Sequence, residues 1–139
     1  MNNSFDAMMF AREVHKDQRR KYTNNQYTDH LAEVAGIVAT VASPAYLDLM
    51  ISVAWLHDSI EDQSVTEKTL EGKFGYVVMR GVLILSDFEE GTRSKRKAAS
   101  RNRLADCPAW IQTIKVADLI SNTASIVEHD QKFAKVYLK

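Results

Sequence analysis

The sequence predicts an all-α fold in one compact domain, and three observations support this prediction. The chain has 139 residues, an ordinary length for a single domain with a sizeable core. Hydrophobic residues make up 45% of it, which is enough apolar side chain to fill that core. Only two prolines occur, and apolar residues recur at helical spacing along most of the chain. We therefore expect one helical bundle over residues 1–139.

The N-terminal part is expected to form three helices. Apolar positions within residues 7–14 fall on one face of a first helix, which should end near Lys21. The pair at 24–25, two asparagines, breaks that helix, and a second amphipathic helix follows His30. Residues 43–44, Ser-Pro, should open the third helix, because proline is favoured in the first turn.

The central part continues in helices. Residues 64–67 match a capping box and should open a short helix that ends near residues 72–75. Residues 76–85 are expected to be helical, with a buried strand as the alternative because several side chains are β-branched. Gly91 then precedes a basic segment at 93–103.

Two helices are expected at the C-terminal end. Pro108 opens a long helix to about Glu128, and Asp130 caps a final turn or helix. The apolar pattern still continues at Lys139. This suggests a partner surface, such as that of a homo-oligomer, or a shortened chain.

Composition excludes several classes of protein. The 18 basic and 18 acidic residues balance, so no overall field attracts nucleic acid. Cys107 is the only cysteine, which excludes a disulfide framework and favours a reducing compartment. Neither a signal peptide nor an apolar stretch of membrane-spanning length is present. We expect a cytoplasmic protein with no membrane or nucleic-acid partner.

The pair His57-Asp58 ends the apolar run 51–56 and is followed by Glu61 and Asp62. On a helix these four positions share one broad face, so three acids and one imidazole would point the same way. Buried acids are unfavourable without a partner, and such a group calls for a cation. An ordinary solvated helix end with an incidental histidine is the alternative.

Other apolar elements supply two further metal-binding side chains. His30 precedes an amphipathic stretch, and Asp118 lies in a stretch apolar enough to be a core helix, with Lys115 and Asn122 on the same face. Two imidazoles and two carboxylates suit a divalent metal such as manganese, iron, zinc or magnesium, with positions left open for water and substrate. The predicted ligands are His30, His57, Asp58 and Asp118.

The order His, His-Asp, Asp resembles the signature of the HD-domain metal-dependent phosphohydrolases. The stretches 11–21, 54–62, 74–75 and 113–122 are similar to the hydrolase domain of RelA/SpoT-type enzymes in its stand-alone form, the small alarmone hydrolases. The resemblance covers nearly the whole chain from about Phe5, and it implies an HD-domain helical bundle that binds manganese. Two-metal relatives need more histidine ligands than this chain offers, so one metal ion is favoured.

The resemblance also implies roles for Glu61 and Asp62. They would position the attacking water and accept its proton. The alternative is that they orient the histidine ligands.

Four further residues are expected to bind substrate. Arg20 and Lys21 match the family's basic pair, which lies against the nucleotide base and phosphates; an ordinary charged helix end is the alternative. Asn122 matches a position near the ribose, and Lys115 could reach a phosphate or a ligand carboxylate. The basic segment 93–103 is either solvated surface or a second phosphate-binding face.

The implied activity is manganese-dependent removal of the 3′-pyrophosphate of guanosine tetra- or pentaphosphate, (p)ppGpp, giving GDP or GTP and pyrophosphate. Residues 26–31 lack the two prolines that flank the family's first ligand, and the loop at 22–25 lacks the family's usual glycine and proline. Because this loop borders the base in the family, adenine alarmones are an alternative substrate. A phosphatase acting on a dinucleotide such as NADPH is another. A nucleotide-binding regulator without turnover is the third, although Glu61 and Asp62 favour an enzyme.

Overall fold

The structure, a computed structural model, describes residues 3–88 and 90–138. Those residues form nine α-helices and no strand longer than an isolated bridge, so the all-α prediction is confirmed. The helices are α1 (Ser4–Val14), α2 (Thr28–Val41), α3 (Leu47–Leu56), α4 (Ser59–Gln63), α5 (Glu67–Phe74), α6 (Tyr76–Leu85), α7 (Arg93–Ala105), α8 (Ala109–His129) and α9 (Gln131–Tyr137).

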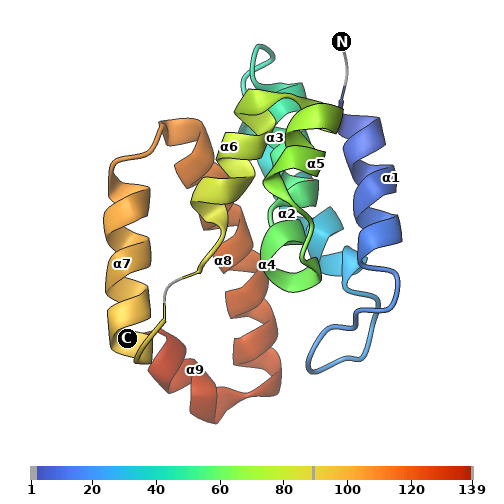
Figure 1. The fold of residues 1–139 in the computed structure, drawn as a ribbon. Helices are drawn as coiled ribbons and strands as arrows, with labels where there is room; N and C mark the ends of the chain where they lie inside the picture. The colour runs from blue at the N-terminus through green and yellow to red at the C-terminus, as the bar shows by residue number, and fades with distance from the viewer. Residues whose placement is uncertain (1–2, 89, 139) are drawn as a thin grey trace.

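Helix α3 lies at the centre of the bundle and packs against α1, α2, α6 and α8 (Figure 1). Its sequence is apolar on nearly every side, which is the pattern expected of a buried helix. Val53, Ala54 and Leu56 are completely buried, and burial of a leucine side chain contributes about 1.5–3 kcal/mol. Helix α8 packs along α2 on one side, while α7 lies at the edge of the bundle beside α8 (Figure 1). Helices α2, α3 and α8 therefore contact one another, and this packing fixes the relative positions of the side chains that they carry.

The first helix is shorter than predicted, because α1 ends at Val14 and not near Lys21. Residues 15–27 form an irregular connector that folds back on itself, with an isolated bridge between Arg19 and Gln26. Asn24, one of the two predicted helix breakers, has a φ of +59° and donates its backbone N–H to the Arg20 carbonyl, 3.1 Å away. Arg20 and Lys21 therefore lie on a loop and not at a helix end.

Three other predicted boundaries were wrong by a few residues. Helix α3 begins at Leu47, after a turn that contains Pro44, so this proline lies outside the helix. The cap of α5 is Thr66, whose side chain accepts a hydrogen bond from the Thr69 N–H at 3.1 Å, and not Ser64, which has a φ of +58°. His57 and Asp58 form a turn between α3 and α4, so the predicted continuous helix through residues 57–62 is interrupted there.

The C-terminal elements agree with the predictions. Residues 76–85 are helical, and α8 begins directly after Pro108. Asp130 caps α9 by accepting a hydrogen bond from the Phe133 N–H at 3.0 Å. Lys139, where the apolar pattern was still continuing, lies outside the described residues. Among the described helices, none combines the length and the apolar character needed to cross a membrane.

Candidate functional site

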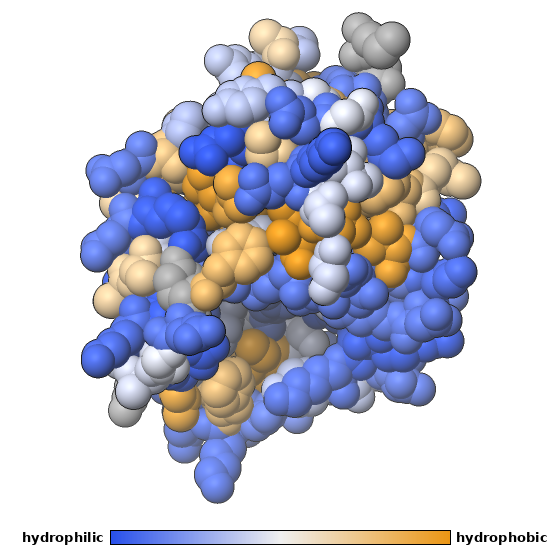
Figure 2. All heavy atoms as spheres, in the orientation of Figure 1, coloured by the Kyte–Doolittle hydropathy of each residue, from blue (hydrophilic) through white to orange (hydrophobic). Residues whose placement is uncertain are grey.

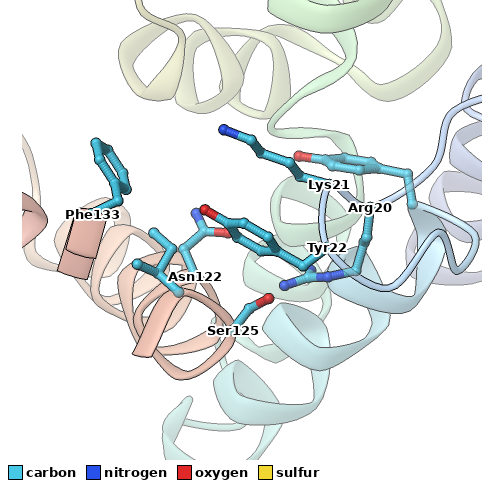
Figure 3. Close-up of a pocket in the computed structure, with 8 residues that line it drawn as sticks. Arg20, Lys21, Tyr22, Asn122, Ser125 and Phe133 are labelled. Carbon is cyan, nitrogen blue, oxygen red and sulfur yellow. The ribbon is translucent and has the colours of Figure 1, made fainter. Parts of the chain in front are cut away.

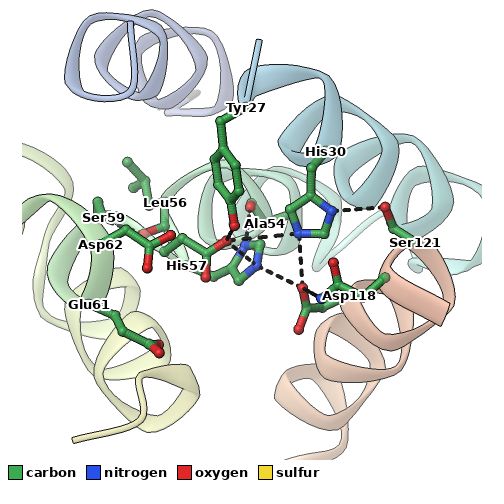
Figure 4. A network of polar contacts seen from close by, with 12 residues as sticks. Tyr27, His30, Ala54, Leu56, His57, Ser59, Glu61, Asp62, Asp118 and Ser121 are labelled. Atoms are coloured by element: carbon green, nitrogen blue, oxygen red, sulfur yellow. Dashed lines mark hydrogen bonds and ion pairs between the residues drawn. The ribbon is translucent and has the colours of Figure 1, made fainter. Parts of the chain in front are cut away.

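Four side chains from three parts of the bundle converge at its centre (Figure 4). His30 comes from the first turn of α2, the pair His57-Asp58 from the turn after α3, and Asp118 from the middle of α8. One nitrogen or oxygen atom of each lies within 4.8 Å of those of the other three. We call these residues the four-residue cluster; they are the predicted metal ligands, brought together from positions far apart in the sequence.

The end of α3 explains how two adjacent residues, His57 and Asp58, both face this point. The last carbonyl groups of a helix lack partners within it. Here the ring Nδ1 of His57 donates to the Ala54 carbonyl at 2.6 Å, and the Ser59 hydroxyl donates to the Leu56 carbonyl at 2.6 Å. Because side chains satisfy these carbonyls, the helix can end within the core and the chain can turn.

Hydrogen bonds on the far side of each imidazole fix which nitrogen faces the cluster. Because Nδ1 of His57 donates to Ala54, its Nε2 is the nitrogen that faces the cluster. The Ser121 hydroxyl donates to Glu33 and therefore accepts from Nδ1 of His30, 2.8 Å away. Both Nε2 atoms are thus held toward the carboxylates, and an unprotonated Nε2 in this position can bind a metal ion.

The carboxylates of the cluster are buried and closely paired. Asp118 Oδ1 lies 3.0 Å from His30 Nε2 and 3.3 Å from His57 Nε2, and Asp58 Oδ2 lies 3.1 Å from His57 Nε2. Tyr27 donates its hydroxyl to Asp58 at 2.6 Å, and Lys115 donates to Asp118 at 3.1 Å. This donor set, two imidazole nitrogens and two carboxylate oxygens within reach of one point, fits a divalent metal ion.

The electrostatics of the cluster also favour a cation. Burial by itself lowers the pKa of His57, but the carboxylates of Asp58 and Asp118 raise that pKa well above its ordinary value. Burial raises the pKa of Asp118, yet hydrogen bonds from His30 and His57 hold it well below its usual range. The two buried carboxylates therefore stay ionised and require positive charge beside them, from a proton on an imidazole or from a metal.

A cavity of about 220 Å³ opens beside the cluster, and we call it the cluster cavity. Figure 2 shows this face of the molecule hollowed between α7 and α4. Besides His57, Asp58 and Asp118 of the cluster, its walls include Glu61, Asp62, Lys97, Lys115, Asn122 and Tyr137. Both acids and lysines therefore line this cavity.

Glu61 and Asp62 lie on the cavity wall and are bonded to other groups than the histidines. Glu61 accepts a hydrogen bond from the Asp87 N–H at 3.2 Å, and Asp62 accepts one from Gln18 at 3.2 Å. Burial, reinforced by the charge of Asp58, raises the pKa of Glu61 to about 7 and also raises that of Asp62. Orientation of the imidazoles falls to Ala54 and Ser121, so the two acids are left facing the cavity.

A second cavity, of about 190 Å³, adjoins the first, and we call it the Arg20 cavity (Figure 3). Its lining includes Arg20, Lys21, Tyr22 and Phe133. Tyr27 and Asn122 line both cavities, and Asn122 also donates to Asp118 at 3.2 Å. A ligand can therefore extend from the cluster, past Asn122, to the basic pair on the connector.

Several residues of this site were not singled out from the sequence. Ser121 follows Asp118 by three positions and Tyr27 precedes His30 by three, so helical spacing could have indicated both. Lys97 was predicted only as one member of the basic segment 93–103, and Tyr137 carries no signal, because their approach to the cavity depends on how α7 and α9 pack.

The fold and the cluster together define a class of proteins: helical bundles in which a histidine, a His-Asp pair and a distant aspartate surround one candidate metal site. Comparison with family models agrees: the HD domain model matches residues 7–115. The chain belongs to the HD domain family.

The chain is also similar to curated proteins. The chain is 29% identical over 118 residues to guanosine-3′,5′-bis(diphosphate) 3′-pyrophosphohydrolase MESH1 of Danio rerio, covering 84% of this chain and 65% of that protein. It is 28% identical over 126 residues to a probable guanosine-3′,5′-bis(diphosphate) 3′-pyrophosphohydrolase of Synechocystis, covering 86% of this chain and 16% of that protein. The chain thus spans just under two thirds of MESH1.

A solved structure has the same fold. It is described as a metazoan ortholog of SpoT that hydrolyses ppGpp and plays a role in starvation responses. The TM-score is 0.81 at 23% sequence identity, over 92% of this chain and 72% of that chain. At this identity the likeness establishes the fold.

Proposed function

We propose that this protein is a manganese-dependent hydrolase that removes the 3′-pyrophosphate of (p)ppGpp, giving GDP or GTP and pyrophosphate. The observation that carries the proposal is the four-residue cluster, which borders a cavity lined by further acids and by two lysines. The names of the MESH1 and Synechocystis relatives support the same substrate.

His30, His57, Asp58 and Asp118 would hold the manganese ion. When bound, such an ion polarises a phosphoryl oxygen and lowers the pKa of water. The protein's own part is to fix both Nε2 atoms through Ala54 and Ser121 and to keep the carboxylates ionised, against the effect of burial, through hydrogen bonds and neighbouring positive charge.

Glu61 is proposed to accept the proton of the attacking water. A general base works best when its pKa lies near the working pH, and burial raises that of Glu61 to about 7. Asp62, on the same short helix α4, would position the water. A protein that only binds nucleotides gains nothing from a base tuned in this way.

The substrate would lie across the two cavities. Lys115 would neutralise charge beside Asp118, and Asn122, at the boundary between the cavities, would contact the sugar. Arg20 and Lys21 would lie against the base and the 5′-phosphates, since a guanidinium can stack on a purine and also bind phosphate.

The test is to offer purified, manganese-supplemented protein ppGpp, pppGpp, the adenine analogues and NADPH in parallel and to identify the products. Pyrophosphate release from the guanine substrates, abolished by a chelator, is the expected result. Faster turnover of the adenine analogues would assign an adenine nucleotide as the substrate in place of the guanine nucleotide. Orthophosphate release from NADPH alone would assign a phosphatase reaction in place of the proposed one. No turnover of any compound by metal-bound protein would leave a nucleotide-binding regulator.

A further inference from the structure

Helix α7 presents three cations toward the body of the protein, although most of its charges face solvent. Arg93, Lys97 and Arg103 are only partly exposed, whereas Lys95 and Arg101 on the same helix are exposed. Positions 93 and 97 are four residues apart, which places their side chains one above the other on a helix.

Two of these three cations have protein partners that hold α7 in place. Arg103 donates to the Ile84 carbonyl at 2.8 Å and to Asp87 at 2.6 Å, which ties the helix to the end of α6. Arg93 lies over the rings of Phe133 and Tyr137, 5.3 Å and 6.0 Å from their centroids, which ties it to α9. The helix is thus fixed on both sides of Lys97.

Lys97 differs from its two neighbours. It lines the cluster cavity, yet it forms no ion pair or hydrogen bond with any residue that the structure describes. Burial lowers its pKa, and so do the positive charges of Lys115 and Arg93, while the carboxylate of Asp87 in the same cavity offsets part of this effect. A half-buried lysine beside two other cations is unfavourable unless an anion enters between them.

We propose that Lys97, together with Lys115, binds the distal phosphate of the substrate's 3′-diphosphate group. This inference rests on the proposed function. Lys115 lies next to the cluster through Asp118, and Lys97 lines the same cavity close enough to Lys115 for their charges to interact. The phosphate attached to the ribose would sit at the cluster, and the second phosphate would reach the two lysines. The pair therefore selects a diphosphate ester over a monophosphate ester.

The first measurement is the affinity of manganese-loaded protein for inorganic pyrophosphate and for orthophosphate, by calorimetry. Lys97→Gln should weaken pyrophosphate binding by about tenfold or more, because a charge-assisted hydrogen bond is lost. Orthophosphate binding should stay the same, since one phosphate reaches only the cluster. Lys97→Arg should retain most of the affinity, and Lys95→Gln, an exposed change on the same helix, should have no effect.

Thermal unfolding separates this role from a structural one. Because burial and the charges of Lys115 and Arg93 outweigh the attraction of Asp87, Lys97→Gln should keep or raise the melting temperature of the metal-free protein. Unchanged pyrophosphate affinity in Lys97→Gln, or an equal loss for both anions, would overturn the inference. Neither the affinity measurement nor the unfolding measurement requires turnover. If pyrophosphate binding depended on Lys97 but ppGpp were not hydrolysed, the proposed function would fail while the proposed binding site would be supported.

Discussion

His30 and Ser121, 91 positions apart in the sequence, are joined by a buried hydrogen bond of 2.8 Å. The Ser121 hydroxyl in turn donates a hydrogen bond to Glu33. These polar groups hold the Nδ1 edge of the imidazole, while the Nε2 atom lies toward the cluster. Supporting partners of this kind orient a metal ligand and increase its basicity.

Ser121→Ala should therefore weaken manganese binding by about 10–100-fold without unfolding the protein. The alanine removes the acceptor of the His30 N–H and leaves the four ligands unchanged. Metal titration monitored by calorimetry measures this directly. Ser125→Ala, one turn further along α8, is the control and should bind metal as the wild type does; equal affinities in both variants would show that Ser121 does not support His30.

Glu61→Gln and Asp58→Asn should separate the chemistry from metal binding. Glu61→Gln keeps the shape of the side chain but cannot accept the proton, so turnover should fall by about 10²–10⁴-fold with metal affinity unchanged. Asp58→Asn should lose metal and turnover together, because it removes a carboxylate of the cluster. Full activity in Glu61→Gln would exclude Glu61 as the base.

The pH dependence of the rate is a second test of Glu61 as the general base. Only ionised Glu61 can accept a proton, so kcat/KM should rise with pH and level off once the pKa of Glu61 is passed. Burial raises that pKa to about 7, and a bound cation would lower it, so the rise should lie at or below that pH. The residual activity of Glu61→Gln should lack this rise. A wild-type rate that is flat throughout the acidic range would contradict the assignment.

Arg20→Ala should raise KM more than it lowers kcat. Arg20 lines the Arg20 cavity and not the cluster cavity, so its loss should weaken substrate binding while the chemistry is kept. Steady-state kinetics with ppGpp measure both constants. Arg19→Ala is the matched control, because Arg19 is adjacent and exposed. A loss confined to kcat would place Arg20 among the groups that act in the transition state.

Two glycines in helices provide a test of packing. A Cβ at Gly81 of α6 would lie 2.8 Å from Cη2 of Trp110 and 3.3 Å from Cγ2 of Val53, whereas one at Gly36 of α2 would meet nothing within 4 Å. Gly81→Ala should therefore destabilise the fold by about 1–3 kcal/mol. Gly36→Ala should stabilise it by up to about 1 kcal/mol, through helix propensity. Urea unfolding of both variants gives the two free energies, and equal values would refute this picture of the α6–α8 contact.

The helices could be predicted from the sequence because their apolar residues recur at helical spacing. The end of α1 could not, because residues 15–21 contain no strong helix breaker. What holds this connector out of the helix is distant in sequence: Gln18 bonds to Asp62, and Tyr27 bonds to Asp58. Local propensity carries no information about such contacts.

The site shows the same division. Ligand-type residues on apolar elements are unusual enough that His30, His57, Asp58 and Asp118 could be selected from the sequence, and they do meet in the structure. The basic segment of α7 could not be resolved in this way, because a run of lysines and arginines has no face until the helix is packed. In the structure, the contacts of Arg93 and Arg103 fix the orientation of α7, and in that orientation Lys97 lines the cavity.

The most direct test of the proposed reaction is to incubate manganese-loaded protein with ppGpp in isotopically labelled water and to analyse both products by mass spectrometry. We expect GDP and pyrophosphate in equal amounts, with the heavy oxygen in the pyrophosphate, because water attacks the phosphorus next to the ribose. Asp118→Asn should give no product. Intact ppGpp after incubation with protein that demonstrably holds the metal, or release of orthophosphate in place of pyrophosphate, would contradict the proposal.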